Sequence, residues 1–188
     1  IKRLLKKSPS YVFRRVVSEL QHELDRFSQP RYGKNFTTKK LLNCLGDLEI
    51  ESCWSRLERQ ENPFYFPANP LDHSIELGEG LNRVLEKADQ AIEHKIDLMG
   101  SGLIPLGENI NWLQDYKSGD VWPTGYFRGI DYMNPGRSSD VKTVWELSRM
   151  QWLIPCGQAY VLTGDEKYAR ATKEVLESWI AGNPYAMT

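Results

Sequence analysis

A short segment near the end of the sequence contains residues that can bind an acidic sugar. Glu146 and Arg149 stand three residues apart and can pair, and Arg149 shares a stripe of the predicted helix with Trp145 and Trp152. Two indole rings and a guanidinium beside a carboxylate can stack a sugar ring and hold its carboxylate or sulfate. The stripe therefore predicts a binding cleft. The structural alternative is that Glu146 and Arg149 form only an internal salt bridge that ties the helix to the preceding loop.

The segment before this helix is a long loop rich in aromatic residues. From Leu103 to Asp140 there is no periodicity, and Gly, Pro, Asn and Asp alternate with aromatic rings, namely Trp112, Tyr116, Trp122, Tyr126, Phe127 and Tyr132. A loop of this length in a compact domain is usually functional. Flat apolar sugar faces stack on aromatic rings, while sugar hydroxyls need polar partners. We expect Trp122 and Tyr132 to line the cleft; the alternative is that such rings only pin the loop to the core.

The sequence shows no metal or cofactor signature. No HxH or HExxH spacing marks a metal site, and His73 is an isolated loop histidine that could act as a base. The loop aspartates, Asp115, Asp120, Asp131 and Asp140, lack the regular spacing of a calcium loop. We therefore expect neither a metal nor a cofactor. The three cysteines form no CxxC pair, which predicts free thiols.

The elements that must position these residues form a helical hairpin. Between 143 and 162 apolar residues surround the helix axis, which predicts a buried inner helix kinked by Pro155. Thr163-Gly164-Asp165 predicts a turn, and residues 166–181 form an amphipathic outer helix. Such a pair is the repeat unit of an α/α toroid or solenoid. The sequence predicts a mainly all-α fold: an incomplete (α/α) toroid of helical hairpins with a long aromatic-rich loop.

The whole chain, residues 1–188, is expected to form a single domain with three parts. Residues 1–100 would contain helices and connectors, 101–142 the aromatic loop, and 143–182 the hairpin. We expect a helix from Ser10 that ends before Pro30, and a short helix capped by Thr37 or Thr38 that runs through Leu45. A loop-rich connector with one short strand should follow, and then a helix that starts near Leu81 and stops near Gly100.

Charge limits the possible partners. The chain has 24 Lys and Arg against 25 Asp and Glu, which disfavours general nucleic-acid binding. Its first residues are basic, with no acid before Glu19, namely Lys2, Arg3, Lys6, Lys7, Arg14 and Arg15. This predicts peripheral contact with a membrane surface or a phosphate-bearing partner; the alternative is a solvated helix face. No apolar run is long enough to cross a bilayer, and no export signal is visible in the sequence. A cytoplasmic location is therefore slightly favoured over a periplasmic one.

The second half of the chain contains an ordered series of short motifs. They are Asn111-Trp112-Leu113-Gln114-Asp115, Ser118-Gly119, Trp122-Pro123, Ile130-Asp131-Tyr132, Asp140-Val141-Lys142-Thr143-Val144-Trp145-Glu146-Leu147-Ser148-Arg149, Thr163-Gly164-Asp165-Glu166-Lys167-Tyr168, Ser178-Trp179-Ile180 and Asn183-Pro184. This series resembles the N-terminal domain of the heparinase II/III-like (alginate-lyase-like) polysaccharide lyases. The resemblance covers the chain well from about Gly100 and loosely before it.

The resemblance implies a larger enzyme, in which the rest of the toroid and a β-sandwich domain follow this part. Members of the family cleave uronic-acid polysaccharides by β-elimination: an Asn neutralises the uronate carboxylate, and a Tyr and a His transfer protons. The Asn usually follows the Asn-Pro motif in a Gly-x-Asn-Trp segment, and this sequence ends at Thr188, just after Asn183-Pro184. The resemblance therefore predicts that the chain has no catalytic residue, needs the C-terminal remainder of the enzyme and is inactive alone.

Two functional hypotheses follow. In the first, the chain is the substrate-binding part of a polysaccharide lyase, and its groove for an acidic (uronic-acid) polysaccharide is lined by Lys142, Trp145, Glu146, Arg149, Trp152, Tyr132 and Trp122. In the second, it is a non-catalytic helical interaction module, associated with surface-polysaccharide biosynthesis or a membrane surface, whose basic N-terminal helix docks on a membrane or partner. Binding of acidic polysaccharides separates the two.

Overall fold

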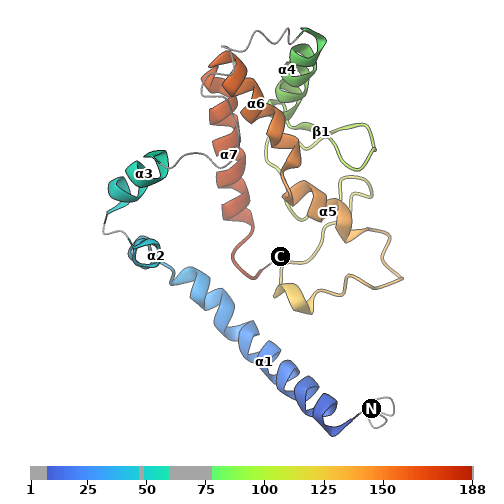
Figure 1. Cartoon of the computed structure of the whole chain (residues 1–188). Coiled ribbons are helices and arrows are strands. Elements are labelled where there is room, and N and C mark those ends of the chain that lie inside the picture. Colours follow the sequence, from blue (N-terminus) through green and yellow to red (C-terminus); the bar gives the residue numbers. More distant parts are fainter. Residues whose placement is uncertain (1–7, 47–48, 60–77, 188) are drawn as a thin grey trace. The chain divides into compact units, whose positions relative to one another are not determined.

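The computed structural model describes residues 8–46, 49–59 and 78–187, which are mostly helical (Figure 1). The prediction of a mainly all-α fold is confirmed. The elements are α1 (Pro9–Lys34), α2 (Thr38–Leu45), α3 (Ile50–Arg59), α4 (Gly78–Ile92), β1 (Lys95–Asp97), β2 (Leu103–Pro105), η2 (Phe127–Gly129), α5 (Val141–Ser148), η3 (Gln151–Leu153), α6 (Ile154–Thr163) and α7 (Glu166–Gly182). They belong to two compact units, one with residues 1–55, 124–130 and 184–188, the other with 56–123 and 131–183.

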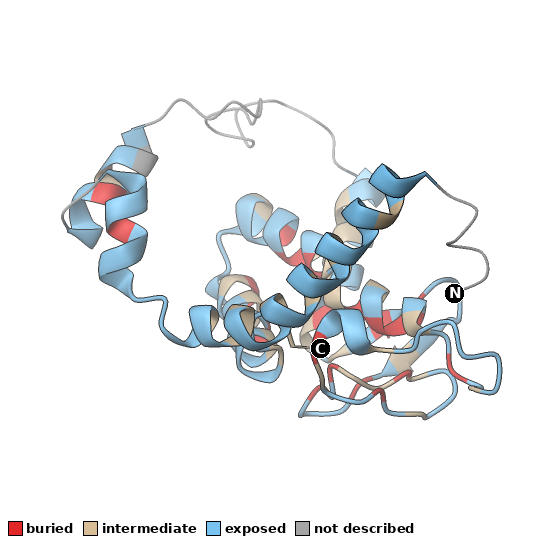
Figure 2. Ribbon diagram, turned by 90° about the horizontal axis from the view of Figure 1, so that it is seen from below, coloured by how far each residue is buried: buried red, intermediate tan, exposed pale blue. Residues whose placement is uncertain are grey.

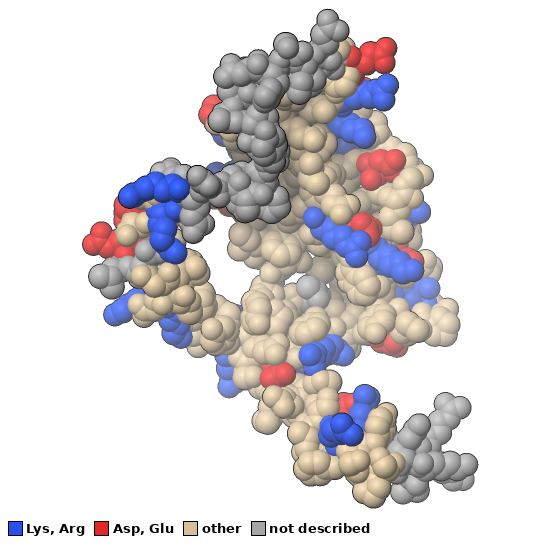
Figure 3. Space-filling view, in the orientation of Figure 1, with Lys and Arg blue, Asp and Glu red and all other residues tan. Residues whose placement is uncertain are grey.

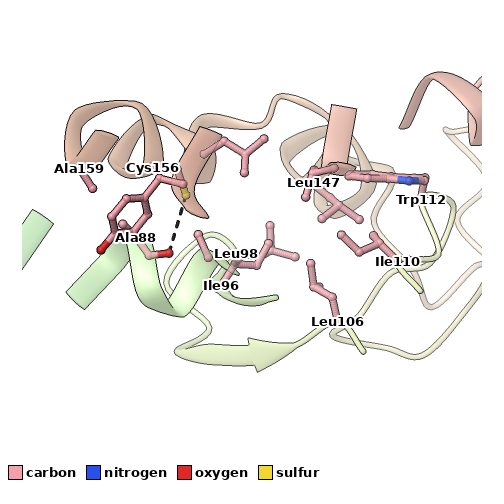
Figure 4. Packing of buried hydrophobic residues seen from close by; sticks show 13 residues of the cluster. Ala88, Ile96, Leu98, Leu106, Ile110, Trp112, Leu147, Cys156 and Ala159 are labelled. Atoms are coloured by element: carbon pink, nitrogen blue, oxygen red, sulfur yellow. Dashed lines mark hydrogen bonds between the residues drawn. The ribbon is translucent and has the colours of Figure 1, made fainter. Parts of the chain in front are cut away.

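The core of the second unit lies between α4, α6 and α7. Leu147, Cys156 and Ala159 are fully buried, and they belong to a cluster that also includes Ala88 on α4 and Trp112 in the loop (Figure 4). The Cys156 thiol donates a hydrogen bond to the carbonyl of Ala88 with a sulfur–oxygen distance of 3.7 Å. The small side chains of Ala88, Cys156 and Ala159 let α4 and α6 approach closely, because larger ones would hold the two helices apart.

The predicted turn between the last two helices is confirmed. Gly164 takes the left-handed conformation, with φ of 70°, and ends α6. The side chain of Asp165 accepts a hydrogen bond from the Lys167 amide at 2.9 Å and caps α7. The result is the expected hairpin, and α7 places Tyr168 and Val175 in the core.

The expected continuous inner helix is wrong: the helix breaks at Met150. Helix α5 ends at Ser148, and Met150 takes a left-handed conformation with φ of 55° before the short turn η3. Helix α6 then begins at Ile154, with Pro155 in its first turn. Pro155 therefore causes no kink, because a first-turn residue needs no amide hydrogen to complete the helix.

The segment 143–162 is more buried than α7, as expected, but it is not buried on all sides. Buried positions in this segment are Thr143, Val144, Leu147, Leu153, Cys156 and Ala159, against Tyr168 and Val175 between 166 and 181. However, Trp145, Ile154 and Val161 are exposed. Figure 2 shows that buried, intermediate and exposed positions alternate along the helices of the described chain. The apolar pattern around the helix axis overestimated burial because each half of the broken helix packs through a single face.

Three expectations for the first hundred residues need correction. Helix α1 continues through Pro30 to Lys34, since proline costs the helix one hydrogen bond but keeps a helical φ. The expected connector contains helix α3, and the expected strand near residue 65 lies outside the described residues. Helix α4 ends at Ile92, and Ile96 lies on β1, where it pairs with Ile104 of β2. The cap of α2 by Thr37 is confirmed.

In the first unit, α1 is an amphipathic helix without a single buried residue. The expected start at Ser10 is wrong: α1 begins at Pro9, and its N-cap is Ser8, whose hydroxyl accepts a hydrogen bond from the Tyr11 amide at 3.4 Å. Near its other end, Gly33 lies against the side chain of Tyr185. Among the described residues, no helix has both the length and the apolar character to cross a membrane.

Candidate functional site

The aromatic loop is organised around the buried carboxylate of Asp115. One oxygen accepts hydrogen bonds from the amides of Lys117 and Ser118, and the other from the hydroxyls of Ser118 and Ser139 and the amide of Asp140. Burial by itself raises the pKa of Asp115, but these hydrogen bonds outweigh it and hold the pKa below its usual value. The carboxylate therefore stays ionised at neutral pH, and its hydrogen bonds join residues 115–118 of the loop to residues 139 and 140.

Trp122 lies inside this loop structure and is only 4% exposed. Its indole Nε1 donates a hydrogen bond to the hydroxyl of Ser139 at 2.7 Å, and Ser139 in turn donates to Asp115 at 3.0 Å. The guanidinium of Arg137 lies over the ring, 4.2 Å from its centroid. The ring expected to stack on a sugar is therefore placed in the core and supports Arg137.

Helix α5 presents a polar and aromatic face, which we call the α5 face: Lys142, Trp145, Glu146 and Arg149. Asp140 caps the helix by accepting a hydrogen bond from the Lys142 amide at 2.9 Å. The four residues follow at intervals that place them on one side of the helix. The opposite side, which includes Leu147, is buried in the core. Burial of that side fixes which residues α5 turns towards solvent.

An aromatic pair adjoins the α5 face. The ring of Tyr132 lies 6.1 Å from that of Trp145, at an interplanar angle of 55°. Tyr132 is 56% exposed and Trp145 47%. Exposed rings in contact offer apolar surface on which a sugar ring can stack. The structure thus brings together two of the aromatic residues that the sequence indicated.

Trp152 does not join the α5 face. Its Nε1 donates a hydrogen bond to the carbonyl of Leu147 at 3.1 Å, and its ring is partly buried against the core cluster. The left-handed turn at Met150 redirects the chain, so helical spacing no longer relates Trp152 to Arg149. The expected stripe of Trp145, Arg149 and Trp152 is therefore wrong as geometry.

Glu146 and Arg149 do form an ion pair, and it lies at the surface. The side chain of Glu146 is 28% exposed and that of Arg149 59%. The pair joins Glu146 of α5 to Arg149, the C-cap residue of the same helix, so it does not tie the helix to the loop. An exposed pair of this kind contributes at most about 1 kcal/mol to stability. The Arg149 guanidinium is therefore accessible to an anion from solvent.

The loop also contains an open pocket that no sequence pattern indicated. We call it the Arg137 pocket; it has a volume of about 440 Å³ and is lined by Asp120, Val121, Asn134, Gly136, Arg137 and Ser138. Its residues come from two stretches of a loop without periodicity, so spacing gives no sign that they meet. The one available signal was an arginine among glycines and serines near several aromatic residues.

For the described residues, no cluster of three or more His, Cys, Asp or Glu side chains suitable for a metal ion is found. The possible base His73 lies outside the described part of the chain. Both oxygens of Asp115 are taken by protein donors, so this aspartate has no open coordination position.

Comparison with known proteins identifies the family. The family model described as "Heparinase II/III N-terminus" matches residues 72–188. This match covers more than half of the chain, and the chain therefore belongs to the heparinase II/III N-terminus family. The matched residues include the whole aromatic loop, the α5 face and the α6–α7 hairpin.

Several curated relatives share part of this sequence. A heparin-sulfate lyase of Pedobacter heparinus is 29% identical over 55% of this chain and 13% of its own length. One from Bacteroides stercoris is 33% identical over 52% of this chain and 12% of its own. One from Bacteroides thetaiotaomicron is 46% identical over 32% of this chain and 8% of its own. The chain thus spans about an eighth or less of these relatives.

A solved structure of heparinase III with methylated lysines is also similar. It shares 24% identity, covers 77% of this chain and 19% of its own, and gives a TM-score of 0.46.

Proposed function

We propose that this chain is the N-terminal toroid segment of a polysaccharide lyase and contributes to a groove that binds an acidic, uronic-acid polysaccharide. The rest of the toroid and the catalytic residues would come from the C-terminal remainder of the same enzyme. Membership of the heparinase II/III N-terminus family supports the proposal, as do partial relatives named heparin-sulfate lyase.

The observation that carries the proposal is the exposed α5 face beside Tyr132. It combines two cations, Lys142 and Arg149, with an accessible indole ring on a helix whose other side is fixed in the core. Aromatic rings stack on the apolar faces of sugars, and arginine pairs with carboxylates or sulfates through two parallel hydrogen bonds. A rigid helix holds these groups at constant spacing along the polymer.

In β-elimination the substrate carboxylate must be held while the neighbouring C–H loses its proton. Groups that bind carboxylates on other sugar units fix the register of the chain and bring the reacting unit to the catalytic residues. We assign this positioning role to Arg149 and Lys142. Trp145 and Tyr132 would support the sugar ring between the charged groups.

Titration of the 188-residue chain with heparin oligosaccharides, followed by tryptophan fluorescence, tests the proposal. We expect saturable binding, at least about tenfold weaker in Arg149→Ala, because a charge-assisted hydrogen bond is worth about 1.5–3 kcal/mol. Lys173→Ala removes an exposed α7 cation, paired with Glu177, and serves as the matched control. Absence of binding, or equal affinities for both variants, contradicts the proposal.

A second candidate function rests on α1, whose apolar side chains face solvent. Five of these side chains repeat at spacings of four and three residues and are 42–70% exposed, namely Phe13, Val17, Leu20, Leu24 and Phe27. In Figure 3, basic side chains are spaced along this helix among uncharged ones, and some acidic side chains lie between them. The sequence before Glu19 has six basic residues and no acidic one. We infer that α1 docks on an anionic membrane surface, where apolar burial and charge act together.

Sedimentation with lipid vesicles tests this second function. The chain should bind vesicles that contain phosphatidylglycerol and not those of phosphatidylcholine alone. Leu20→Glu should abolish binding, whereas Leu176→Glu, at an exposed apolar position of α7, should retain it. Failure to bind either vesicle contradicts membrane docking, and a stable dimer that Leu20→Glu abolishes would show that a second copy of the chain covers α1 instead.

A further inference from the structure

The Arg137 pocket, an open depression of the surface, brings together one cation, one carboxylate and neutral polar groups. Its volume of about 440 Å³ lies in the range of small-molecule sites. The lining residues Asp120, Asn134, Arg137 and Ser138 are polar, and all belong to the second unit. A metal ion is a poor occupant because the pocket offers a single carboxylate and an arginine.

The guanidinium of Arg137 is held in place by the ring of Trp122, on which it stacks. The guanidinium lies 4.2 Å from the centroid of Trp122, which is itself fixed by the hydrogen bond from Nε1 to Ser139. Stacking occupies the flat face of a guanidinium and leaves its N–H groups, which lie in the plane, available. The structure gives Arg137 no carboxylate partner among the described residues. The side chain is thus an oriented donor for a planar anion.

The neighbouring polar groups suit hydroxyls. The Ser138 hydroxyl donates to one oxygen of Asp120 at 2.7 Å, which leaves the other oxygen able to accept from a ligand hydroxyl. The Oδ1 atom of Asn134 accepts a hydrogen bond from the Gly136 amide at 2.9 Å, so its amide nitrogen is oriented by that contact and remains a donor. Donors and acceptors for hydroxyls therefore surround a site for an anion.

We propose that the Arg137 pocket binds one acidic sugar unit, with its carboxylate or sulfate on the Arg137 guanidinium and its hydroxyls on Asp120 and Asn134. This inference deepens the proposed function, on which it rests, by adding a second contact point to the α5 face. A polymer with repeated anionic groups would engage both. The Asp120 carboxylate disfavours an anion without neighbouring hydroxyls, so the site selects sugars over simple anions.

The test compares binding of three probes to the full 188-residue chain: a heparin hexasaccharide, its carboxyl-reduced form and its desulfated form. Arg137→Gln should lower affinity for the parent hexasaccharide about tenfold, and Arg137→Lys should restore little of it, because an ammonium cannot stack and fork. If the carboxylate is bound, Arg137→Gln should have no effect on the carboxyl-reduced probe. If the sulfate is bound, Arg137→Gln should not change affinity for the desulfated probe.

Arg149→Gln, measured in parallel, separates this inference from the proposed function. Affinity lowered by Arg149→Gln but unchanged by Arg137→Gln overturns the pocket and leaves the α5 face intact. A melting temperature lowered by Arg137→Gln with unchanged affinity gives Arg137 a structural role only and also overturns the pocket. Failure of the unsubstituted chain to bind any of the three probes overturns both proposals.

Discussion

Gly182, the last residue of α7, lies directly against the indole of Trp112 in the aromatic loop. A Cβ atom at Gly182 would come within 2.9 Å of Cδ1 of Trp112. The indole is 4% exposed, and its Nε1 donates a hydrogen bond to the Ser178 hydroxyl at 3.1 Å. The ring is thus enclosed by protein and fixed to α7. This contact joins the start of the loop to the end of the outer helix.

Gly182→Ala should therefore destabilise the chain by about 1–2 kcal/mol, because overpacking against the buried indole exceeds the gain in helix propensity. Gly157→Ala is the matched control: Gly157 lies in α6, and apart from its chain neighbours and the backbone of its own helix nothing lies within 4 Å of its Cβ position. It should stabilise the chain by up to about 1 kcal/mol. Urea unfolding measures both. A stabilising Gly182→Ala would show that the indole moves freely.

Asp115 should make the stability of the chain depend on acid pH. Because its pKa is lowered in the folded state, its contribution is complete above the unfolded pKa and is lost as pH falls through the lower folded value. Asp115→Asn should cost about 2–3 kcal/mol at pH 7, since an amide nitrogen would then face hydrogen-bond donors. The difference from the unsubstituted chain should shrink as pH falls from 4 to 3.

Asp131→Asn replaces an exposed residue of the same loop and is the control for Asp115→Asn. Denaturant midpoints measured from pH 7 to pH 3 should hardly separate Asp131→Asn from the unsubstituted chain. If the two variants are equally stable at pH 7, the Asp115 hydrogen bonds do not hold the loop.

The three cysteines should differ sharply in reactivity. Cys44 is exposed, whereas Cys53 and Cys156 are buried, and burial raises the pKa of the Cys156 thiol. Alkylation requires an accessible thiolate. Iodoacetamide at pH 8, followed by mass spectrometry, should label Cys44 first and Cys156 only when the chain unfolds. Rapid labelling of Cys156 without denaturant would show that α4 and α6 separate in the native state.

Local signals explain which parts of the fold could be predicted. The end of α6 at Gly164 and the cap of α7 at Asp165 follow from residue types that favour those conformations in nearly any context. The break at Met150 gives no such signal, because a methionine rarely takes a left-handed conformation. Tertiary packing of Leu147 and Leu153 on the same core holds that turn.

The same distinction applies to the candidate site. Trp145 and Glu146 belong to one short helix and Arg149 is its C-cap in a helical conformation, so their spacing was enough to place them on one face. The contact of Arg137 with Trp122 joins two points of an irregular loop, and its geometry depends on the hydrogen bonds of Asp115 and Ser139. No periodic pattern encodes such a contact. The sequence therefore indicated Trp122 as a stacking residue but not its place beneath Arg137.

The last prediction concerns Glu146, whose carboxylate pairs with Arg149 on the α5 face. An acidic sugar must compete with this carboxylate for the guanidinium. Glu146→Gln should therefore raise affinity for heparin oligosaccharides about threefold or more, while it changes stability by less than about 1 kcal/mol because the pair lies at the surface. Binding titration and urea unfolding of the same variant measure the two effects.

Glu177→Gln provides the matched control, because Glu177 pairs with Lys173 at 2.8 Å on the exposed side of α7. It makes the same change in net charge, so a general electrostatic effect would raise affinity equally in both variants. A rise confined to Glu146→Gln places the bound anion at Arg149. A fall in Glu146→Gln would instead mean that the carboxylate orients the guanidinium for the sugar, and that the two residues bind as a unit.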